Sequence, residues 1–145
     1  MYTILNPHID AGRLLPMFAA HSEEMYGDQG NFDICHLQAM ANADLVRIFA
    51  VQNCSGQYIG YAMFLLNRDI FKAHKRQAEC IAFYVRPEYR NLVIASKLMR
   101  HAENALAYLD KVVKVVTTTS NNRSLQAFYE RLGYSVTNVQ VTKEL

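Results

Sequence analysis

Apolar residues along this chain of 145 residues follow two different spacings, and each spacing predicts its own kind of element. Where apolar residues stand three or four positions apart, the pattern predicts amphipathic helices over 8–26, 34–43, 94–109 and 124–132. Short runs rich in β-branched and aromatic residues predict strands over 45–52, 58–67, 78–85 and 111–119. A further apolar run over 3–7 ends at Pro7, which favours an edge strand.

Residues that start, stop or interrupt elements support these boundaries. Pro16 is expected to break or kink the first helix, because proline removes a backbone donor. Asn121 and Asn122 can each cap the last helix, and Gly133 is a plausible residue just beyond its C-cap. Residues 53–57 form a turn, so the strands on either side of it make a hairpin.

The order of the elements indicates the fold class. Three strands follow one another closely and predict antiparallel pairing, whereas the helix over 94–109 joins its flanking strands into a parallel βαβ unit. Residues 134–145 alternate, and predict one closing strand or a tight hairpin about Thr137 and Asn138. The prediction is one α/β (α+β) domain over 1–145, with a mixed central sheet flanked by about four helices.

Composition and charge exclude several classes of protein. With 51% apolar and 19% charged residues, the chain is typical of a globular domain and unlike a disordered one. A formal net charge of +2 is too small to favour a nucleic-acid partner, and the basic connection over 68–76 is more typical of a solvated loop. No stretch is long and apolar enough to cross a membrane, and the N-terminal residues lack the pattern of a signal peptide.

Residues that form disulfides or bind metals are sparse. Three cysteines, Cys35, Cys54 and Cys80, are an odd number at wide spacing, which favours free thiols. The five histidines are scattered, and no pair has metal-ligand spacing with a carboxylate. We therefore expect a cytoplasmic protein without a metal site and without a membrane partner.

A basic bend stands between the strand over 78–85 and the helix that follows it. Here the chain reads V85-R-P87 and then R90-N-L-V-I-A95, so a helix begins near Leu92. The first N–H groups of a helix lack intrahelical acceptors and carry a partial positive charge, which suits a phosphate or diphosphate. Arg86 and Arg90 flank the bend and can add charge-assisted hydrogen bonds. A plain strand-to-helix turn with solvated arginines fits the same local pattern.

A second motif lies one strand further on, where the chain reads N122-R-S-L-Q-A-F-Y129-E-R-L-G133-Y134. Together the two motifs resemble the GNAT superfamily of acyl-CoA-dependent N-acetyltransferases. That family has V-x-P, then Arg/Gln-x-x-Gly-x-Gly/Ala and a helix, and later N-x-x-(A/S)-x-x-(F/L)-Y-E-x-x-G-(F/Y). The order of predicted elements also follows the family, so the resemblance covers nearly the whole chain.

The sequence departs from the family pattern at two places. Val93 stands where the family most often has glycine, which lets the backbone approach a diphosphate closely. About a dozen residues follow Gly133, where the family usually finishes with two longer strands. Either the last strands are very short, or one is missing and a second subunit covers the sheet edge in a homodimer.

The resemblance implies direct transfer of an acetyl group from acetyl-CoA to a primary amine in a ternary complex. Backbone groups of Phe83 and Val85 would pair with the pantetheine arm, and the N–H groups from Asn91 to Ser96 would bind the diphosphate. Asn122 would contact the cofactor arm, and it can cap its helix at the same time. The residues that the resemblance assigns to the cofactor are Phe83, Val85, Arg90, Asn91, Leu92, Val93, Ile94, Ala95, Ser96, Asn122 and Tyr129.

The reaction also needs groups that handle protons. An alkyl ammonium with a pKa of ~10.4 is free amine in only about one of 2,500 molecules at pH 7, so a base or a desolvating site is needed. By resemblance, Glu79 is the candidate base and Tyr129 protonates the leaving sulfur. A solvated Glu79 carboxylate is an equally good interpretation, and an ordered water chain would then replace it as the base.

The sequence does not identify the amine acceptor, which is a small molecule or a peptide. Tyr26, Asp28, Asn31 and Asp33 lie in the loop over 26–33, where the family usually shapes its acceptor site, although a turn-rich loop has the same residues. The alternative function is a catalytically silent relative that binds CoA weakly and acts as an interaction module.

Overall fold

One five-stranded sheet forms the centre of the protein in the computed structural model, which describes residues 2–5, 11–119 and 122–145. The strand order is β1-β2-β3-β4-β5, as in the chain. Neighbouring strands are antiparallel from β1 to β4, and β4 and β5 are parallel. This confirms the predicted mixed sheet with a single parallel crossover. The strands are β1 (Tyr2–Leu5), β2 (Val46–Asn53), β3 (Tyr58–Arg68), β4 (Arg76–Val85) and β5 (Val112–Thr117).

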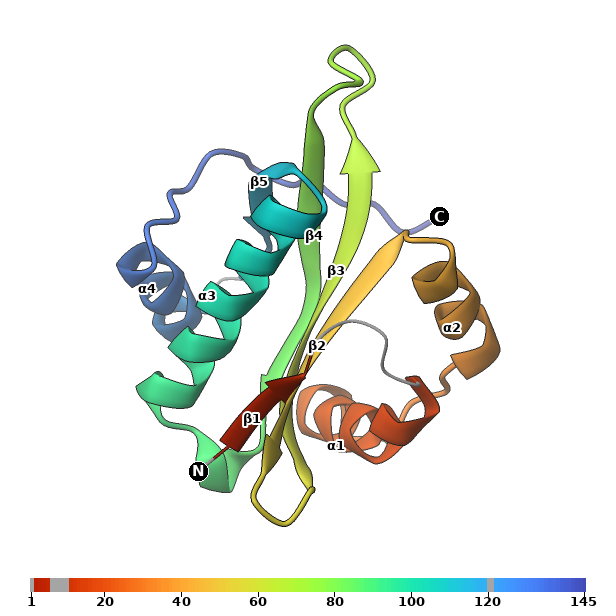
Figure 1. The fold of residues 1–145 in the computed structure, drawn as a ribbon, viewed down its shortest axis with the longest axis vertical. Coiled ribbons are helices and arrows are strands. Elements are labelled where there is room, and N and C mark those ends of the chain that lie inside the picture. The colour runs from red at the N-terminus through yellow and green to blue at the C-terminus, as the bar shows by residue number, and fades with distance from the viewer. Residues whose placement is uncertain (1, 6–10, 120–121) are drawn as a thin grey trace.

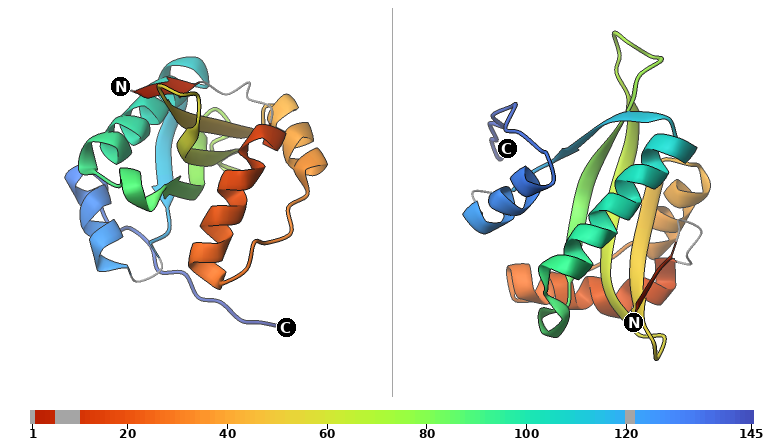
Figure 2. Two further views of the ribbon diagram at one scale, coloured as in Figure 1. Left: turned by 90° about the horizontal axis from the view of Figure 1, so that it is seen from below. Right: turned by 60° about the vertical axis from the view of Figure 1, so that its left-hand side comes forward.

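Helices cover both faces of the sheet (Figures 1 and 2). The pair α1 and α2 lies on one face, and the pair α3 and α4 lies on the other. Each face has its own core of buried side chains, one centred on Phe64 and Leu98 and the other on Met17 and Ile48. The helices are α1 (Leu15–Tyr26), α2 (Ile34–Asn42), α3 (Leu92–Leu109) and α4 (Arg123–Arg131), with short 3-10 helices η1 (Ala11–Leu14) and η2 (Pro87–Tyr89).

Pro16 does not break a helix, contrary to the expectation from the sequence. It is the second residue of α1, where its missing N–H group would have had no intrahelical acceptor. The residues before it form η1, so the 3-10 helix leads directly into α1. Residues 8–10, which the prediction also included, lie outside the described part of the chain.

The predicted helix ends of α4 are confirmed. Asn122 is the N-cap, and its side chain accepts a hydrogen bond from Leu125 N at 3.0 Å. Gly133 lies just beyond the C-cap with a φ of +95°, a conformation that L side chains rarely adopt. The other predicted cap, Asn121, lies outside the described residues.

The parallel strands β4 and β5 separate halfway along β4. Their pairing runs from Arg76 opposite Val112 to Cys80 opposite Thr117, and it goes no further. At the same point β4 carries a bulge against β3, because Met63 pairs with Ala82 and Phe64 with Cys80, which leaves Ile81 extra. Figure 2 shows β5 leading away from β4 toward α4. The half of β4 that follows Cys80 therefore has one edge without a partner strand.

The predicted closing strand or hairpin over 134–145 is wrong. These residues form no helix or strand, and Val136, Val139 and Val141 are 71%, 89% and 91% exposed. Alternation makes a segment compatible with a strand, but a strand also needs a neighbour for its hydrogen bonds. In the view of Figure 1 the segment leaves α4 and crosses behind the strands, and it pairs with none of them.

Among the described residues, no helix is both long and apolar enough to cross a membrane.

Candidate active site

A cleft of about 410 Å³ lies at the open end of β4, between α1 on one side and α3 and α4 on the other. It contains three kinds of surface: backbone of β4, the first turn of α3, and the first turns of α4. The cleft is lined by His21, Glu24, Met25, Phe83, Tyr84, Val85, Arg90, Asn91, Ala95, Asn122, Ser124, Leu125 and Phe128.

The backbone of β4 faces this cleft because β5 no longer pairs with β4 beyond Cys80. Arg86 N donates to Ile59 O at 2.8 Å, so Arg86 turns its amide toward β3. Hydrogen-bonding direction alternates along a strand, which turns the backbone groups of Phe83 and Val85 away from β3 and toward the open edge. One of these groups already has a partner, since Arg90 Nε donates to Val85 O at 2.7 Å.

The first turn of α3 offers fewer free amides than the sequence suggested. Asn91 N donates to Tyr89 O at 2.8 Å, and the Asn91 side chain caps the helix by accepting from Ile94 N at 2.9 Å. Ala95 N donates to Asn91 O at 3.4 Å. Of the amides described between Asn91 and Ala95, that of Val93 is left without an acceptor. Three of these amides thus have protein acceptors, and binding of a diphosphate by the N–H groups from Asn91 to Ser96 stays a prediction.

Val93 does not fill the cleft. Its side chain is 54% exposed and does not line the cleft. The neighbouring Ile94 is buried in the core under α3. The side chain that replaces the family glycine is thus exposed and is not part of the lining of the cleft.

The structure brings together about half of the residues predicted to bind the cofactor. Phe83, Val85, Arg90, Asn91, Ala95 and Asn122 all line the cleft. Ser96 lines a neighbouring hollow. For Leu92 the structure describes the backbone, which is the first residue of α3.

Arg90 is held by protein groups on three sides. Its Nη2 forms an ion pair with the Glu24 carboxylate on α1, its Nε donates to Val85 O, and its guanidinium lies 5.4 Å from the centre of the Tyr84 ring. The hydrogen bond from Arg90 is the main cause that lowers the pKa of Glu24. The other arginine at the bend, Arg86, donates to Tyr58 O at 3.0 Å. The two side chains thus stabilise the bend itself.

Sequence reasoning missed the α1 side of the cleft. His21 stacks on Tyr84 with 4.7 Å between ring centres, and its Nδ1 lies 2.6 Å from the Tyr61 hydroxyl. Burial lowers the pKa of His21, which favours the neutral ring at pH 7. Nothing local in the sequence marks His21 or Glu24, because only the packing of α1 on the sheet brings them to β4.

Tyr129 lies where β4 and β5 separate. It is 3% exposed, and its side chain makes hydrogen bonds with those of Thr117 and Cys80, the last residues paired between the two strands. Burial raises the pKa of Tyr129 well above its usual value, so the hydroxyl stays protonated at neutral pH. Burial also raises the pKa of the Cys80 thiol to about 12, which keeps it from acting as a nucleophile.

Glu79 lies on the opposite face of the sheet from Tyr129. It is the fourth residue of β4, which begins at Arg76, and not a residue at the strand start. Cys80 belongs to the core under α3, so its neighbour Glu79 points toward the face of α1 and α2. Glu79 is half-buried and does not line the cleft. Its predicted role as base stays a prediction.

The four residues predicted to bind the acceptor stand apart from the cleft. The Asp28 carboxylate accepts from Gly30 N at 2.8 Å, and the Asp33 carboxylate caps α2 by accepting from His36 N at 2.9 Å. Tyr26 and Asn31 are exposed. The two carboxylates thus have local structural roles, and binding of an amine by these residues stays a prediction.

Within the described ranges, no group of three His, Cys, Asp or Glu residues is arranged to hold a metal ion.

The sequence matches a family model described as the acetyltransferase (GNAT) family over residues 13–134. This span includes all the residues that line the cleft, and Tyr129. Among curated proteins, none matches the sequence of this chain.

Solved structures with low sequence identity have the same fold. A ribosomal-protein-alanine N-acetyltransferase from Brucella melitensis biovar Abortus 2308 has a TM-score of 0.78 at 14% identity, covering 100% of this chain and 99% of that one. Glucosamine-6-phosphate N-acetyltransferase from Arabidopsis thaliana has a TM-score of 0.78 at 13% identity, covering 99% and 98%. A predicted acetyltransferase with acetyl-CoA from Clostridium acetobutylicum has a TM-score of 0.76 at 16% identity, covering 99% and 96%.

Proposed function

Because this chain belongs to the acetyltransferase (GNAT) family, we propose that it transfers an acetyl group from acetyl-CoA to a primary amine in a direct ternary complex. The observation that carries the proposal is the open edge of β4 beyond Cys80, which ends at the first turn of α3. An extended, amide-containing arm can pair with such an edge as a strand would. A diphosphate suits the start of a helix.

Residues of the cleft divide between the two parts of the cofactor. Backbone groups of Phe83, and the Val85 amide, would pair with the pantetheine arm, while Asn122 reaches it from the N-terminus of α4. The Val93 amide and the helix dipole would bind the diphosphate. This assignment is supported by the open edge and by the Val93 side chain, which is exposed and does not line the cleft.

The transfer forms one bond and breaks one. The amine nitrogen attacks the thioester carbon, the C–S bond breaks, and the electron pair leaves with the sulfur of CoA. The amine loses one proton, and the sulfur gains one. Since CoA and the amine would enter from opposite faces of the sheet, the gap between β4 and β5 is where we place the reacting carbon. Holding both reactants there replaces a large entropic barrier.

Tyr129 would stabilise the leaving sulfur. Its raised pKa makes it a weak acid, and an ordinary thiol has a pKa of about 8.5, so complete proton transfer from Tyr129 to the thiolate is uphill. A hydrogen bond from the neutral hydroxyl to the sulfur, growing stronger as charge develops, avoids that cost.

Glu79 remains our proposed base. It lies next to Cys80 on the face from which an amine would arrive, and it is half-buried. A carboxylate there can accept the ammonium proton directly or through one water molecule. If it does not, a chain of water molecules in the gap between the strands takes its place.

Binding of CoA is tested first, and transfer to an amine is tested second. Calorimetric titration of the full chain with CoA should give heat and a stoichiometry of about one, and labelled acetyl-CoA with pools of amines should then identify an acceptor. Absence of CoA binding would overturn the proposal. Binding of CoA without transfer to any amine pool, and without slow hydrolysis of acetyl-CoA, would favour the alternative of a silent CoA-binding module.

A further inference from the structure

The loop that joins β3 to β4 extends beyond the rest of the molecule and presents two large apolar side chains to solvent (Figure 1). Ile70 is 90% exposed and Phe71 is 93% exposed. A local hydrogen bond holds this conformation, because the Asp69 carboxylate accepts from Phe71 N at 2.8 Å. We call residues 68–76 the hairpin tip. Its two adjacent apolar side chains belong to neither core of the protein.

The hairpin tip also contains the excess positive charge of the protein. Of the 15 basic and 13 acidic residues of the chain, four basic and one acidic lie in the tip, which leaves 11 basic and 12 acidic residues elsewhere. Arg68, Lys72 and Lys75 are exposed, and none of them forms an ion pair within the part of the chain that the structure describes. Arg68 also lies opposite Arg76 in the register of β3 and β4. Like charges directly opposite each other destabilise a sheet, so an anionic partner would relieve a cost that the free protein carries.

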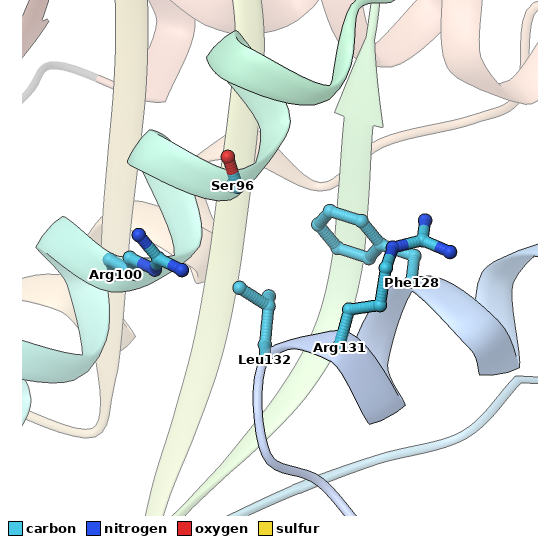
Figure 3. A pocket seen from close by; sticks show the side chains of 5 residues that line it. All are labelled: Ser96, Arg100, Phe128, Arg131 and Leu132. Carbon is cyan, nitrogen blue, oxygen red and sulfur yellow. The ribbon is translucent and has the colours of Figure 1, made fainter.

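The solvated loop that we expected from the sequence accounts for the cations but not for Ile70 and Phe71. Adjacent exposed apolar side chains surrounded by charges are typical of an interaction site. The neighbouring hollow between α3 and α4 has the opposite shape, because there Arg100 and Arg131 flank recessed apolar side chains (Figure 3). The hairpin tip projects instead, so its partner must accept protruding apolar groups and carry negative charge around them.

We propose that the hairpin tip binds the surface of a membrane that contains anionic lipids, with Ile70 and Phe71 inserted among the acyl chains and the surrounding cations at the level of the head groups. Such a bilayer has an apolar interior directly beneath a layer of negative charge. A nucleic acid would attract the same cations, but it has no apolar layer that would bury an isoleucine. Binding at the surface needs no segment that crosses the bilayer, and it revises our expectation of a protein without a membrane partner.

The hairpin tip and the proposed cofactor cleft lie at opposite ends of β4. The tip contains Arg76, the first residue of this strand, and the cleft contains Val85, the last one. At about 3.3 Å per residue, the strand separates the two by roughly 30 Å. Membrane binding would therefore leave the cleft open to CoA, so this inference goes beyond the proposed function and does not depend on it.

Sedimentation of the full chain with lipid vesicles tests the proposal. At low salt the protein should sediment with phosphatidylcholine vesicles that contain about 30% phosphatidylserine and not with phosphatidylcholine alone, because each cation near an anionic surface strengthens binding about fivefold. In the double variants Ile70→Ser/Phe71→Ser and Lys72→Ala/Lys75→Ala, partition into the anionic vesicles should fall about 10-fold or more. Wild-type binding should also fall in about 0.5 M NaCl, which screens the surface charge.

Two control variants make the same changes elsewhere on the molecule. Val139→Ser/Val141→Ser changes two apolar side chains that are about as exposed as those of the hairpin tip. Arg100→Ala/Arg131→Ala removes two charges from the hollow between α3 and α4. Both controls should keep the wild-type partition, and thermal unfolding verifies that all four double variants fold.

A fluorescent probe reports insertion of the hairpin tip directly. The chain has no tryptophan, so Phe71→Trp introduces a single one at the tip. Its emission should shift to the blue when anionic vesicles are added, because the indole ring moves from water into the membrane interface. The emission of Tyr26→Trp, at an exposed position on α1, should not shift.

The outcomes separate a membrane partner from the other partners of the same charge. Absence of partition into anionic vesicles, equal partition into neutral ones, or a partition that survives in both double variants of the tip overturns the proposal. Binding of poly(U) RNA by the wild-type protein without binding of vesicles also overturns it, and assigns the cations to a nucleic acid. The proposed function is decided by the separate titration with CoA, so each of the two can fail while the other stands.

Discussion

The carboxylate of Glu24 on α1 forms an ion pair with the guanidinium of Arg90, which lies 66 residues later at the bend before α3. The pair connects the helix that covers one face of the sheet to the start of the helix that covers the other. Both side chains line the cleft, and Tyr84 lies beneath the guanidinium. Arg90, which we expected from the sequence to bind a diphosphate, thus stabilises the shape of the cleft.

Glu24→Gln should lower the free energy of unfolding slightly, and only above acidic pH. Both partners are more than 40% exposed, so the loss at pH 7 is about 0.5 kcal/mol. The pKa of Glu24 is lowered in the folded state, so its contribution is present above the unfolded-state pKa and disappears as the pH falls through the folded-state pKa. Urea unfolding at pH 7 and pH 3 should show the difference between wild type and variant shrinking; a difference that grows at pH 3 contradicts this sign.

Much of the fold could be predicted because its strongest signals are local. The period of α3, the turn over 53–57 and the cap at Asn122 each depend on neighbouring residues, and the structure confirms all three. The βαβ unit follows from chain order alone. The prediction of a strand or hairpin over 134–145 failed because its signal was not enough by itself. An alternating pattern makes one strand possible, but it does not provide the neighbouring strand that this strand would need.

The candidate site was predictable only within the two motifs of the sequence. Asn91, Ala95 and Asn122 could be named because the resemblance to the family assigns them to the cofactor, and they lie at or near helix starts. The packing of α1 on the sheet is a tertiary property, so nothing in the sequence indicated that Glu24 would form an ion pair with Arg90. The loss of free amides at Asn91 and Ile94 likewise depends on cap geometry, which spacing does not reveal.

Asp110→Ala should destabilise the protein strongly. Asp110 is 6% exposed at the end of α3, and its carboxylate accepts from Arg47 Nη2 at 2.7 Å and Arg47 Nε at 3.2 Å. Removing it leaves a largely buried guanidinium with a weaker partner, at a cost of about 3–5 kcal/mol. Chemical denaturation measures the loss.

A second ion pair of Arg47 provides the control for Asp110→Ala. Asp44 lies 3.1 Å from Arg47 Nη1, but its side chain is 67% exposed. Asp44→Ala should therefore cost no more than about 1 kcal/mol. Equal losses for the Asp44 and Asp110 variants would show that burial does not set the strength of this pair.

Thr117→Val should lower kcat through Tyr129. The Thr117 side chain hydrogen-bonds Tyr129 and lowers its pKa, so its loss would leave the hydroxyl less well oriented and less acidic. We expect kcat to fall about 10-fold with little change in the KM for acetyl-CoA, since the bond acts on the leaving group and not on binding. Thr117→Ser should restore most of the rate, and the exposed neighbour changed in Thr118→Val should have no effect.

A double-mutant cycle separates this positioning role from a general loss of packing. Tyr129→Phe removes the hydroxyl while keeping the ring among Phe83, Phe128 and Tyr134. If Thr117 acts only through that hydroxyl, Thr117→Val should reduce kcat no further in the Tyr129→Phe background. Losses that multiply would assign Thr117 an independent effect, and an unchanged kcat in Tyr129→Phe would remove the tyrosine from the chemistry.

Glu79→Gln should change the pH dependence of the reaction as well as its rate. An ammonium acceptor with a pKa of ~10.4 is almost fully protonated at pH 7, so loss of a base should lower kcat/KM there by about 10²–10⁴-fold. The loss should shrink toward pH 10, where free amine becomes abundant without help. Glu88→Gln is the control, because Glu88 is an exposed carboxylate in η2 and its change removes the same charge. A Glu79→Gln variant whose profile of kcat/KM against pH matches that of wild type would leave proton removal to water, because the carboxylate on the face of α1 and α2 would then take no part.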